Sequence, residues 1–213
     1  MKISPDSLDP ESTYKLLTGV IVPRPIAWVS SMSADQVLNL APFSCFTFVS
    51  NKPPMIGINV GRKAGTRKDT AANITARGEF VVQIPDESMI NDVHLSAVEH
   101  PADISEVEFL GLATAESDLI AVPRLRDVPV SLECRLHSVT EYGDTGAEFI
   151  VGEIVAFHIR DGLLVDGKIE TTVMQPIARI GGPNYASLGR ITRMNPIGQT
   201  PKAVLRSEPT TPH

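Results

Sequence analysis

The chain lacks the cysteine and histidine patterns of disulfide-rich and metal-binding proteins. Its two cysteines, Cys45 and Cys134, show neither paired nor metal-type spacing, and each lies in an apolar run. A disulfide framework and a zinc site are therefore not indicated, and we expect both cysteines to be reduced core residues. The histidines form no H-x-x-x-H or H-E-x-x-H pattern, so we expect no metal.

Long basic runs and long apolar runs are also missing. The formal net charge is −6, and apart from the short segment 62–68 no Lys/Arg-rich block is present to neutralise a nucleic-acid backbone. The apolar runs are too short and too interrupted to span a bilayer, and the first residues are too polar for a signal peptide. We therefore expect a cytoplasmic protein that binds neither nucleic acid nor membrane.

The motifs of several common enzyme classes are absent as well. The sequence has no G-x-S-x-G elbow, no G-x-G-x-x-G segment after a strand and no Walker loop. Hydrolase, Rossmann dehydrogenase and nucleotide triphosphatase functions therefore have no support from the sequence.

The composition is that of one folded domain. A chain of 213 residues with 42% hydrophobic residues can bury one sizeable core, which we place in residues 1–198. Segment 199–213 carries Pro201, Pro209 and Pro212 among threonine, serine and charged residues. This Pro/Thr-rich composition predicts a flexible C-terminal tail.

Most of the expected elements are strands. Runs of β-branched and aromatic residues bounded by Pro, Asn, Asp or Gly predict strands at 26–30, 37–49, 55–60, 79–84, 130–137 and 149–159, the first three being sheet neighbours. Strand 130–137 alternates apolar residues with Ser131, Glu133, Arg135 and His137, so we expect those four on a wet face. Many locally joined strands with few helices favour a closed antiparallel barrel, a mainly β fold.

Short helices are expected between the strands. One begins after Asp9, closes at Gly19 and buries Tyr14, Leu16 and Leu17. A second runs from Thr66 to Gly78, and a third follows Asp86.

An ordered series of motifs narrows the assignment. PRPIAWVSS is followed by NLAPFSCFTFVSNKPPMIGINVG and GTRKDTAANI, and then by EVEFLGLAT, VPVSLECRL and RIGGPNYASLG. In this order, over most of residues 15–188, the chain resembles the flavin reductase-like family of FMN-binding split-barrel proteins. The resemblance implies a Greek-key split barrel, a homodimer and FMN as cofactor. The turn at 33–36 lacks the glycine that tight turns often carry, which leaves its shape open.

The start of the second helix is the candidate phosphate site. Backbone N–H groups at a helix start carry partial positive charge, and Arg67, Lys68 and Thr70 add two cations and a hydroxyl. An isolated string of this kind is more often an exposed helix cap without a ligand. The resemblance makes it the phosphate end of FMN. Asp69 would repel a phosphate, so we assign it to capping N–H groups or to pairing with Arg67.

The resemblance also identifies candidate contacts to the flavin ring. Segment 39–44 looks like the family's ring-lining segment, with a bent or bulged strand as the alternative. Two serines match a hydroxyl pair near the cofactor and Tyr185 matches a late aromatic that reaches the site; strand-end polarity and a packed loop tyrosine are the alternatives. Trp28 is assigned to the core or a dimer interface. The candidate cofactor contacts are Ser30, Ser31, Asn39, Ala41, Pro42, Phe43, Ser44, Asn59, Arg67, Lys68, Thr70 and Tyr185.

These features predict an FMN-dependent oxidoreductase of the flavin reductase type. NADH or NADPH would bind transiently against the flavin and deliver hydride to it, and electrons would pass to an acceptor or to a partner such as a monooxygenase. We assign no catalytic acid or base. The alternatives are an FMN-binding electron carrier or flavin-binding module without nicotinamide turnover, and a barrel that has lost its cofactor and serves as an interaction protein.

Overall fold

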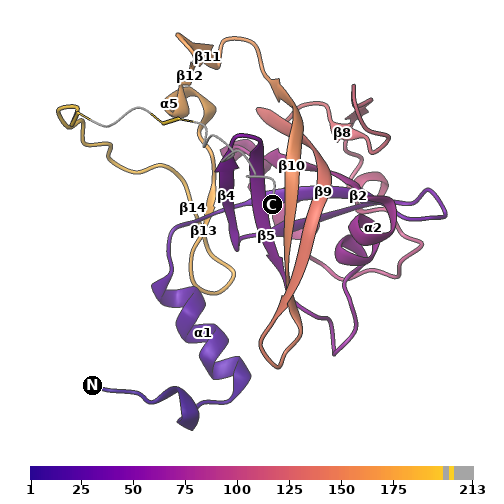
Figure 1. Ribbon diagram of the computed structural model, residues 1–213, viewed down its shortest axis with the longest axis vertical. Coiled ribbons are helices and arrows are strands. Elements are labelled where there is room, and N and C mark those ends of the chain that lie inside the picture. The colour runs from indigo at the N-terminus through magenta and orange to yellow at the C-terminus, as the bar shows by residue number, and fades with distance from the viewer. Residues whose placement is uncertain (199–201, 204–213) are drawn as a thin grey trace, which may run out of the picture.

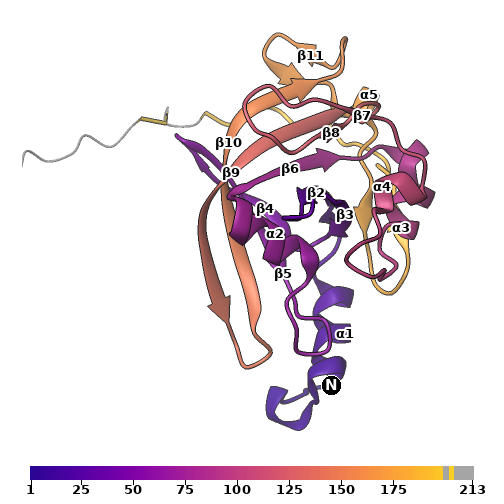
Figure 2. The same ribbon diagram turned by 90° about the vertical axis from the view of Figure 1, so that its right-hand side faces the viewer.

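An antiparallel sheet of seven strands forms the body of the protein. The computed structural model describes residues 1–198 and 202–203, so most of the predicted tail lies outside the described residues. The sheet has the order β3-β2-β6-β9-β10-β5-β4 and curls around a core (Figure 1, Figure 2). The mainly β, antiparallel class predicted from the sequence is confirmed. The strands are β2 (Ala27–Met32), β3 (Leu38–Phe43), β4 (Phe46–Asn51), β5 (Pro54–Val60), β6 (Glu79–Ile84), β9 (Val130–Tyr142) and β10 (Ala147–Ile159).

Helices and short strands surround this sheet. The helices are α1 (Pro10–Val20), α2 (Asp69–Arg77), α3 (Ile90–Leu95), α4 (Glu106–Phe109) and α5 (Thr171–Met174), with 3-10 turns at Pro5–Ser7 and Glu87–Met89. Among the described residues, none of the helices has the length and apolar character needed to cross a membrane. The short strands form three small sheets. In the first, β13 (Ala178–Arg179) lies between β1 (Arg24–Pro25) and β14 (Tyr185–Ala186). In the other two, β7 (Thr114–Ala115) pairs with β8 (Arg124–Leu125), and β11 (Leu164–Val165) pairs with β12 (Lys168–Ile169).

Two apolar clusters lie on opposite faces of β2 because successive side chains of a strand point in opposite directions. Val29 joins the barrel core, which α2 closes with Ala71 and Ile74. Trp28 joins a second cluster with residues of α3 and α4. Its ring is 1% exposed and its Nε1–H donates to Ser96 Oγ at 2.8 Å. The core role predicted for Trp28 is confirmed.

A glycine in β10 lets the sheet close over a large aromatic side chain. Gly152 lies at a register shift between β10 and β9. A Cβ atom at this position would collide with the Phe80 ring, which is fully buried in the barrel core. The absence of a side chain therefore allows the close approach of strand and ring.

The predicted pairing of the first three strands is only partly correct. Segment 37–49 divides into β3, which pairs with β2, and β4, which pairs with β5. β5 is therefore separated from β2 by three strands along the sheet. The Asn59 N–H donates to the Cys45 carbonyl at 2.8 Å and so continues the β4–β5 pairing by one residue. β3 and β5 still come into contact because the sheet curls. The turn between β2 and β3 is made without glycine by Gln36, which has a φ of 65°.

Helix α1 begins as predicted, but its apolar side is exposed. The Asp9 carboxylate accepts from the Ser12 N–H at 2.9 Å, and the helix continues past Gly19 to Val20. Tyr14, expected to be buried, is 65% exposed, and Leu16 and Leu17 are also exposed. The burial prediction is wrong because α1 stands away from the barrel, as Figure 1 shows.

Two further burial predictions fail near the sheet. The alternation of β9 predicted a solvent-exposed face, but Ser131 and Glu133 on that face are buried. The loop before β8 covers this part of the strand, and the N–H groups of Asp118 and Leu119 in that loop donate to the Glu133 carboxylate. Cys45 is exposed because it follows the end of β3, whereas Cys134 is buried as expected.

Candidate functional site

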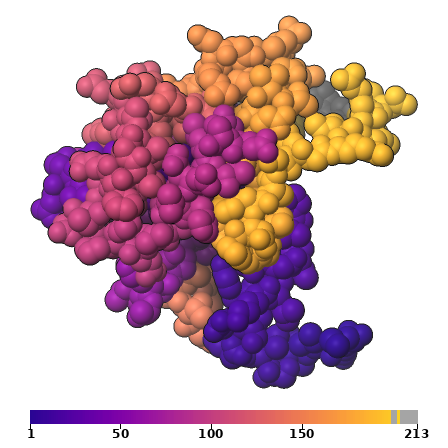
Figure 3. All heavy atoms as spheres, turned by 180° about the vertical axis from the view of Figure 1, so that it is seen from behind, coloured from indigo at the N-terminus to yellow at the C-terminus, as the bar shows by residue number. Residues whose placement is uncertain are grey.

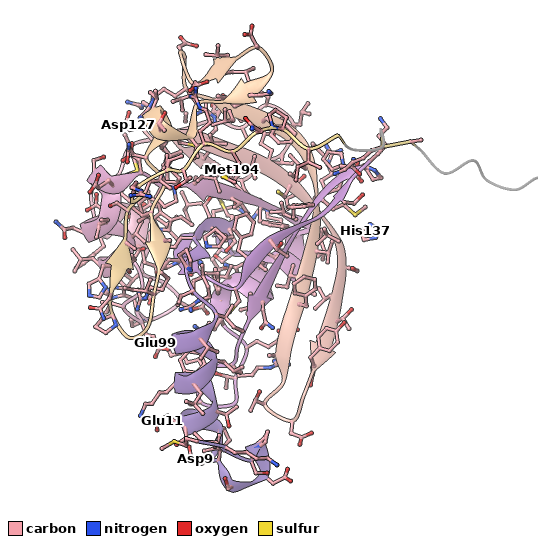
Figure 4. The ribbon with its side chains drawn as sticks, turned by 90° about the vertical axis from the view of Figure 1, so that its left-hand side faces the viewer. Asp9, Glu11, Glu99, Asp127, His137 and Met194 are labelled. Atoms are coloured by element: carbon pink, nitrogen blue, oxygen red, sulfur yellow. The ribbon has the colours of Figure 1, made fainter. Side chains whose placement is uncertain are left out.

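Two adjoining hollows lie beside the 39–44 segment. The smaller one, of about 110 Å³, opens at the start of α2, and the larger one, of about 550 Å³, lies between α1 and the β13–β14 loop. Pro42 and Ala97 line both, so the two hollows share a wall. Figure 3 shows the gold β13–β14 region against the indigo N-terminal segment. The two segments approach closely at a pair of glycines, since a Cβ atom added to Gly181 would lie 3.6 Å from the Gly19 Cα.

The smaller hollow contains the start of α2. Lys68 is the N-cap residue and its side chain does not cap the helix, so the first N–H groups of α2 retain their donor capacity and partial positive charge. The Lys68 Nζ lies 5.9 Å from the centroid of the Phe43 ring. Thr70 is 2% exposed, and its Oγ1 accepts from Asn39 Nδ2 at 2.9 Å. This end of the hollow therefore favours an anion.

Arg67 does not line either hollow. Its guanidinium forms a fork on the buried Glu148, with Nε to Oε2 at 3.0 Å and Nη2 to Oε1 at 2.9 Å. Nη2 also donates to Thr75 Oγ1 at 2.6 Å. Arg67 therefore fastens α2 to β10 and positions the helix start.

The prediction for Asp69 is wrong. Asp69 lies in the first turn of α2 and lines the smaller hollow, but it neither pairs with Arg67, whose partner is Glu148, nor makes a side-chain hydrogen bond to the described residues. Helix α2 starts at Asp69 and not at Thr66, which instead pairs with Lys63 in a tight loop.

Other carboxylates of the smaller hollow already have partners. Glu99 pairs with Lys63 at 3.5 Å, and the buried Glu106 accepts from the Leu40 N–H at 2.9 Å. Lys68, by contrast, makes no ion pair within the part of the chain that the structure describes. Its charge is available to a ligand.

His100 is a site residue that the sequence did not reveal. It lines the smaller hollow, its ring centroid lies 5.0 Å from that of Phe109, and its buried Nε2 has no hydrogen-bond partner among the described residues. A single histidine outside any motif offers no sequence signal. Its ring forms part of the wall of the hollow, and its unpartnered Nε2 lies beneath the surface of that wall.

The larger hollow contains two arginines, Arg24 and Arg179, and the aromatic ring of Tyr185. Arg24 is 6% exposed and donates to Ser44 Oγ at 3.2 Å and to the Thr18 and Ile21 carbonyls at 2.6 Å. The Arg179 guanidinium lies 4.6 Å from the centroid of the Tyr185 ring and donates to its hydroxyl. Burial raises the pKa of Tyr185 despite the opposing charge of Arg179, so the phenol is neutral at pH 7.

The structure brings most of the predicted contacts together. Ser30 is turned away, donating to the Pro123 carbonyl at 2.9 Å, and Ser31 lies behind Asn39 and accepts from its amide at 3.4 Å. Asn59 and Arg67 also lie outside the two hollows. The binding roles of all the predicted contacts stay predictions. The predicted residues in the walls are Asn39, Ala41, Pro42, Phe43, Lys68 and Thr70 in the smaller hollow and Pro42, Ser44 and Tyr185 in the larger.

A separate cluster of titratable groups lies away from both hollows. Ligand atoms of Asp118, Glu133 and His158 lie within 4.8 Å of one another. Both oxygens of Glu133 already accept hydrogen bonds, from two backbone N–H groups and from His158. Glu133 therefore anchors a loop, and both of its carboxylate oxygens are occupied.

Comparisons with known proteins identify relatives along nearly the whole chain. The family profile of the flavin reductase like domain matches residues 20–172. Component B of nitrilotriacetate monooxygenase from Bacillus cereus is similar in structure, with a TM-score of 0.88 and 38% identity, covering 91% of this chain and 98% of that one. A 2-nitrobenzoate 2-nitroreductase from Pseudomonas fluorescens has a TM-score of 0.84 and 33% identity, covering 95% of this chain and 100% of that one. An uncharacterized protein from Halalkalibacterium halodurans is 41% identical, covering 89% of this chain and 93% of the relative.

Proposed function

Because the chain belongs to the flavin reductase-like family of split-barrel proteins, we propose that it is an FMN-binding oxidoreductase. In this proposal electrons pass from NADH or NADPH through FMN to an acceptor. The observation that carries it is the uncapped start of α2, where Lys68 makes no ion pair with any residue that the structure describes. This helix start opens into a hollow that continues past Pro42 into a larger one. A flat phosphorylated cofactor needs an anion site at one end and a roomy slot at the other.

Most residues of the two hollows fit FMN. The N–H groups at the start of α2 and the Lys68 ammonium would hold the phosphate. The Asp69 carboxylate in the same wall opposes this attraction, so the phosphate would lie on the Lys68 side of the hollow. Within residues 39–44, Pro42 and Ser44 would line the ring from the larger hollow, whereas the other lining residues of this segment belong to the smaller hollow. The ring supplies hydride and electron transfer when bound. Pro42 and Ala97 mark the passage between the phosphate end and the ring end.

The protein's own contribution is binding and positioning. The described walls of the larger hollow contain one carboxylate, Glu11, and it is paired with Lys15 at 2.6 Å. We therefore propose no side chain as an acid or base, and expect the rate to depend on how the neutral Tyr185 and its loop limit access to the ring.

The similarities support two kinds of acceptor. Likeness to component B of a monooxygenase supports a partner protein that receives the electrons. Likeness to a nitroreductase supports a small organic acceptor instead. The alternative function, an FMN-binding electron carrier or flavin-binding module without nicotinamide turnover, would use the same FMN site.

We expect the purified protein to hold FMN and to be bleached by NADH or NADPH. The check is quenching of FMN fluorescence on titration, followed by anaerobic absorbance of the flavin band after either nicotinamide is added. Bound FMN that neither nicotinamide bleaches would favour the electron carrier. Failure to bind FMN would overturn the proposal.

We also propose a homodimer, because a large apolar surface is uncovered in the single chain. On α1 and the residue after it, Leu17, Val20 and Ile21 are at least half exposed, at 50%, 72% and 58%, and Phe48 on edge strand β4 is 75% exposed. Patches of this kind mark protein interfaces. Since α1 also lines the larger hollow, FMN would lie near the interface.

Sedimentation is expected to give a mass of twice 23.0 kDa. Val20→Glu places a charge on the exposed side of α1 and should shift the protein toward monomer, whereas Glu11→Gln, at an already polar position, should not. A 23.0 kDa species for the unmodified chain at all micromolar concentrations would contradict the dimer.

A further inference from the structure

The larger hollow, which is the ring end of the proposed FMN site, carries positive charge that the uncharged flavin ring does not need. Its charged lining residues are Glu11, Lys15, Arg24 and Arg179. Glu11 and Lys15 neutralise each other in an ion pair at 2.6 Å. Neither arginine pairs with a carboxylate in the part of the chain that the structure describes. Arg24 is buried and Arg179 is partly buried, and cations removed from water are normally paired. The excess of positive charge therefore favours an anionic ligand.

The two arginines differ in what they can offer to a ligand. Arg24 is fixed in the wall, with its guanidinium donating to the Ser44 hydroxyl and to the carbonyls of Thr18, Ile21 and Ile180. All four acceptors are neutral, so the positive charge remains. Arg24 therefore contributes a fixed field to the hollow.

Arg179 keeps one edge of its guanidinium available. Nε donates to the Gly182 carbonyl at 3.1 Å and Nη1 donates to the Tyr185 hydroxyl. Nη2 donates to no acceptor among the described residues. A guanidinium edge with free N–H groups matches the two oxygens of a carboxylate.

The remaining walls of the larger hollow suit a flat apolar group. Tyr14 and Tyr185 contribute aromatic rings, and Pro42 joins this hollow to the proposed phosphate end of the FMN site. The volume of about 550 Å³ is five times the about 110 Å³ of the smaller hollow and lies in the range of small-molecule sites. An aromatic ring fits between these walls with its acidic group toward Arg179.

We propose that the larger hollow binds a small aromatic carboxylate, with the carboxylate on Arg179 and the ring against Tyr185 and Pro42. This names the class of molecule that lies beside the flavin, and in that respect it rests on the proposed function. Binding of the carboxylate to Arg179 depends only on the hollow itself.

Calorimetric titration of the full chain with benzoate and with benzamide tests the proposal. The two probes share a shape and differ in charge. We expect benzoate to bind about tenfold more tightly than benzamide, since a charge-assisted fork is lost with the neutral probe. Arg179→Gln should reduce this preference to about twofold or less. Lys15→Gln, which removes a cation of the same hollow that is already paired, should preserve it.

Equal binding of the two probes, or a preference that survives Arg179→Gln, would overturn the proposal. Arg179→Lys keeps the charge but not the fork and should give an intermediate preference, which guards against loss of the loop structure in the glutamine variant. If ADP displaces benzoate and binds more tightly in an Arg179-dependent way, the anion site belongs to a dinucleotide phosphate and the carboxylate assignment fails.

The titrations are made with and without saturating FMN, so that the two proposals fail separately. A benzoate preference in a protein that does not bind FMN would sink the oxidoreductase proposal and keep the carboxylate site. FMN binding without a preference for benzoate would keep the oxidoreductase proposal and overturn the carboxylate site. Arg179→Gln should weaken FMN binding less than Lys68→Ala does, because Arg179 lines the ring end of the proposed FMN site and not its phosphate end.

Discussion

Replacing Lys68 with alanine is expected to weaken FMN binding about tenfold to a hundredfold and to leave riboflavin binding nearly unchanged. Lys68 is a cation of the smaller hollow without a carboxylate partner among the described residues, and it stands at the uncapped start of α2. A hydrogen bond to a charged group contributes about 1.5–3 kcal/mol, which corresponds to this range of affinity. Riboflavin has no phosphate and cannot use the interaction.

Two neighbouring cations provide controls for Lys68. Lys63 lines the same hollow but pairs with Glu99, so Lys63→Ala should have a smaller effect on FMN. Arg67→Ala should also weaken FMN, but through the position of α2, and it should lower the melting temperature because Glu148 loses its fork. Lys68→Ala should leave the melting temperature of the FMN-free protein unchanged.

Fluorescence quenching by each flavin measures both affinities, and thermal melting measures the stability. Equal affinity of the unmodified protein for FMN and riboflavin would show that the smaller hollow does not bind the phosphate. A loss of riboflavin affinity in Lys68→Ala as large as that of FMN would place Lys68 at the ring instead.

Local sequence patterns predicted the strands better than their arrangement. β-branched and aromatic runs placed β2, β5, β6 and β10 within a few residues because strand formation depends on side chains that suit a pleated surface. The neighbours of β5 depend on how the barrel closes, which no local pattern contains. Helix α1 shows the same limit, because an amphipathic pattern does not say whether the apolar side packs on its own chain or on another.

The candidate site was predictable only in part, for a similar reason. The 39–44 segment, Lys68 and Thr70 were found because they lie in contiguous motifs. Arg24, His100 and Arg179 come from three distant segments and become site residues only when the fold brings them to the two hollows. The pairing of Arg67 with Glu148 spans 81 positions, so no local pattern separates the role of Arg67 from that of Lys68.

The largest loss of stability is expected from Glu133→Gln. Glu133 is fully buried on β9 and accepts from the Asp118 N–H at 2.6 Å, the Leu119 N–H at 2.7 Å and His158. The glutamine side chain has the same size as glutamate, but its amide replaces one acceptor oxygen with an NH2 donor. One of the present donors, a backbone N–H or His158, is then left without an acceptor. We expect a cost of about 3 kcal/mol, from one lost charged hydrogen bond and one unsatisfied buried donor.

The loss of unfolding free energy caused by Glu133→Gln should be larger at neutral pH than in acid. Burial raises the pKa of Glu133, but the hydrogen bonds from Asp118, His158 and Leu119 together outweigh it and hold the pKa below the ordinary value of 4.5. A carboxyl with a lowered pKa in the folded state stabilises the protein above the pKa of the unfolded chain, and this contribution is lost as the pH falls below 4.5 through the folded-state pKa. The difference between the unmodified protein and the variant should therefore be largest at neutral pH and shrink in acid.

Glu79→Gln is the matched control, because Glu79 anchors the same loop through one hydrogen bond, from the Ala121 N–H at 2.9 Å, and is only partly buried. Its expected cost is about 1 kcal/mol. Urea unfolding of the three proteins between neutral and acidic pH measures the differences. A Glu133→Gln difference no larger than that of Glu79→Gln, or one that does not change with pH, would show that Glu133 is not the charged anchor of the loop that covers β9.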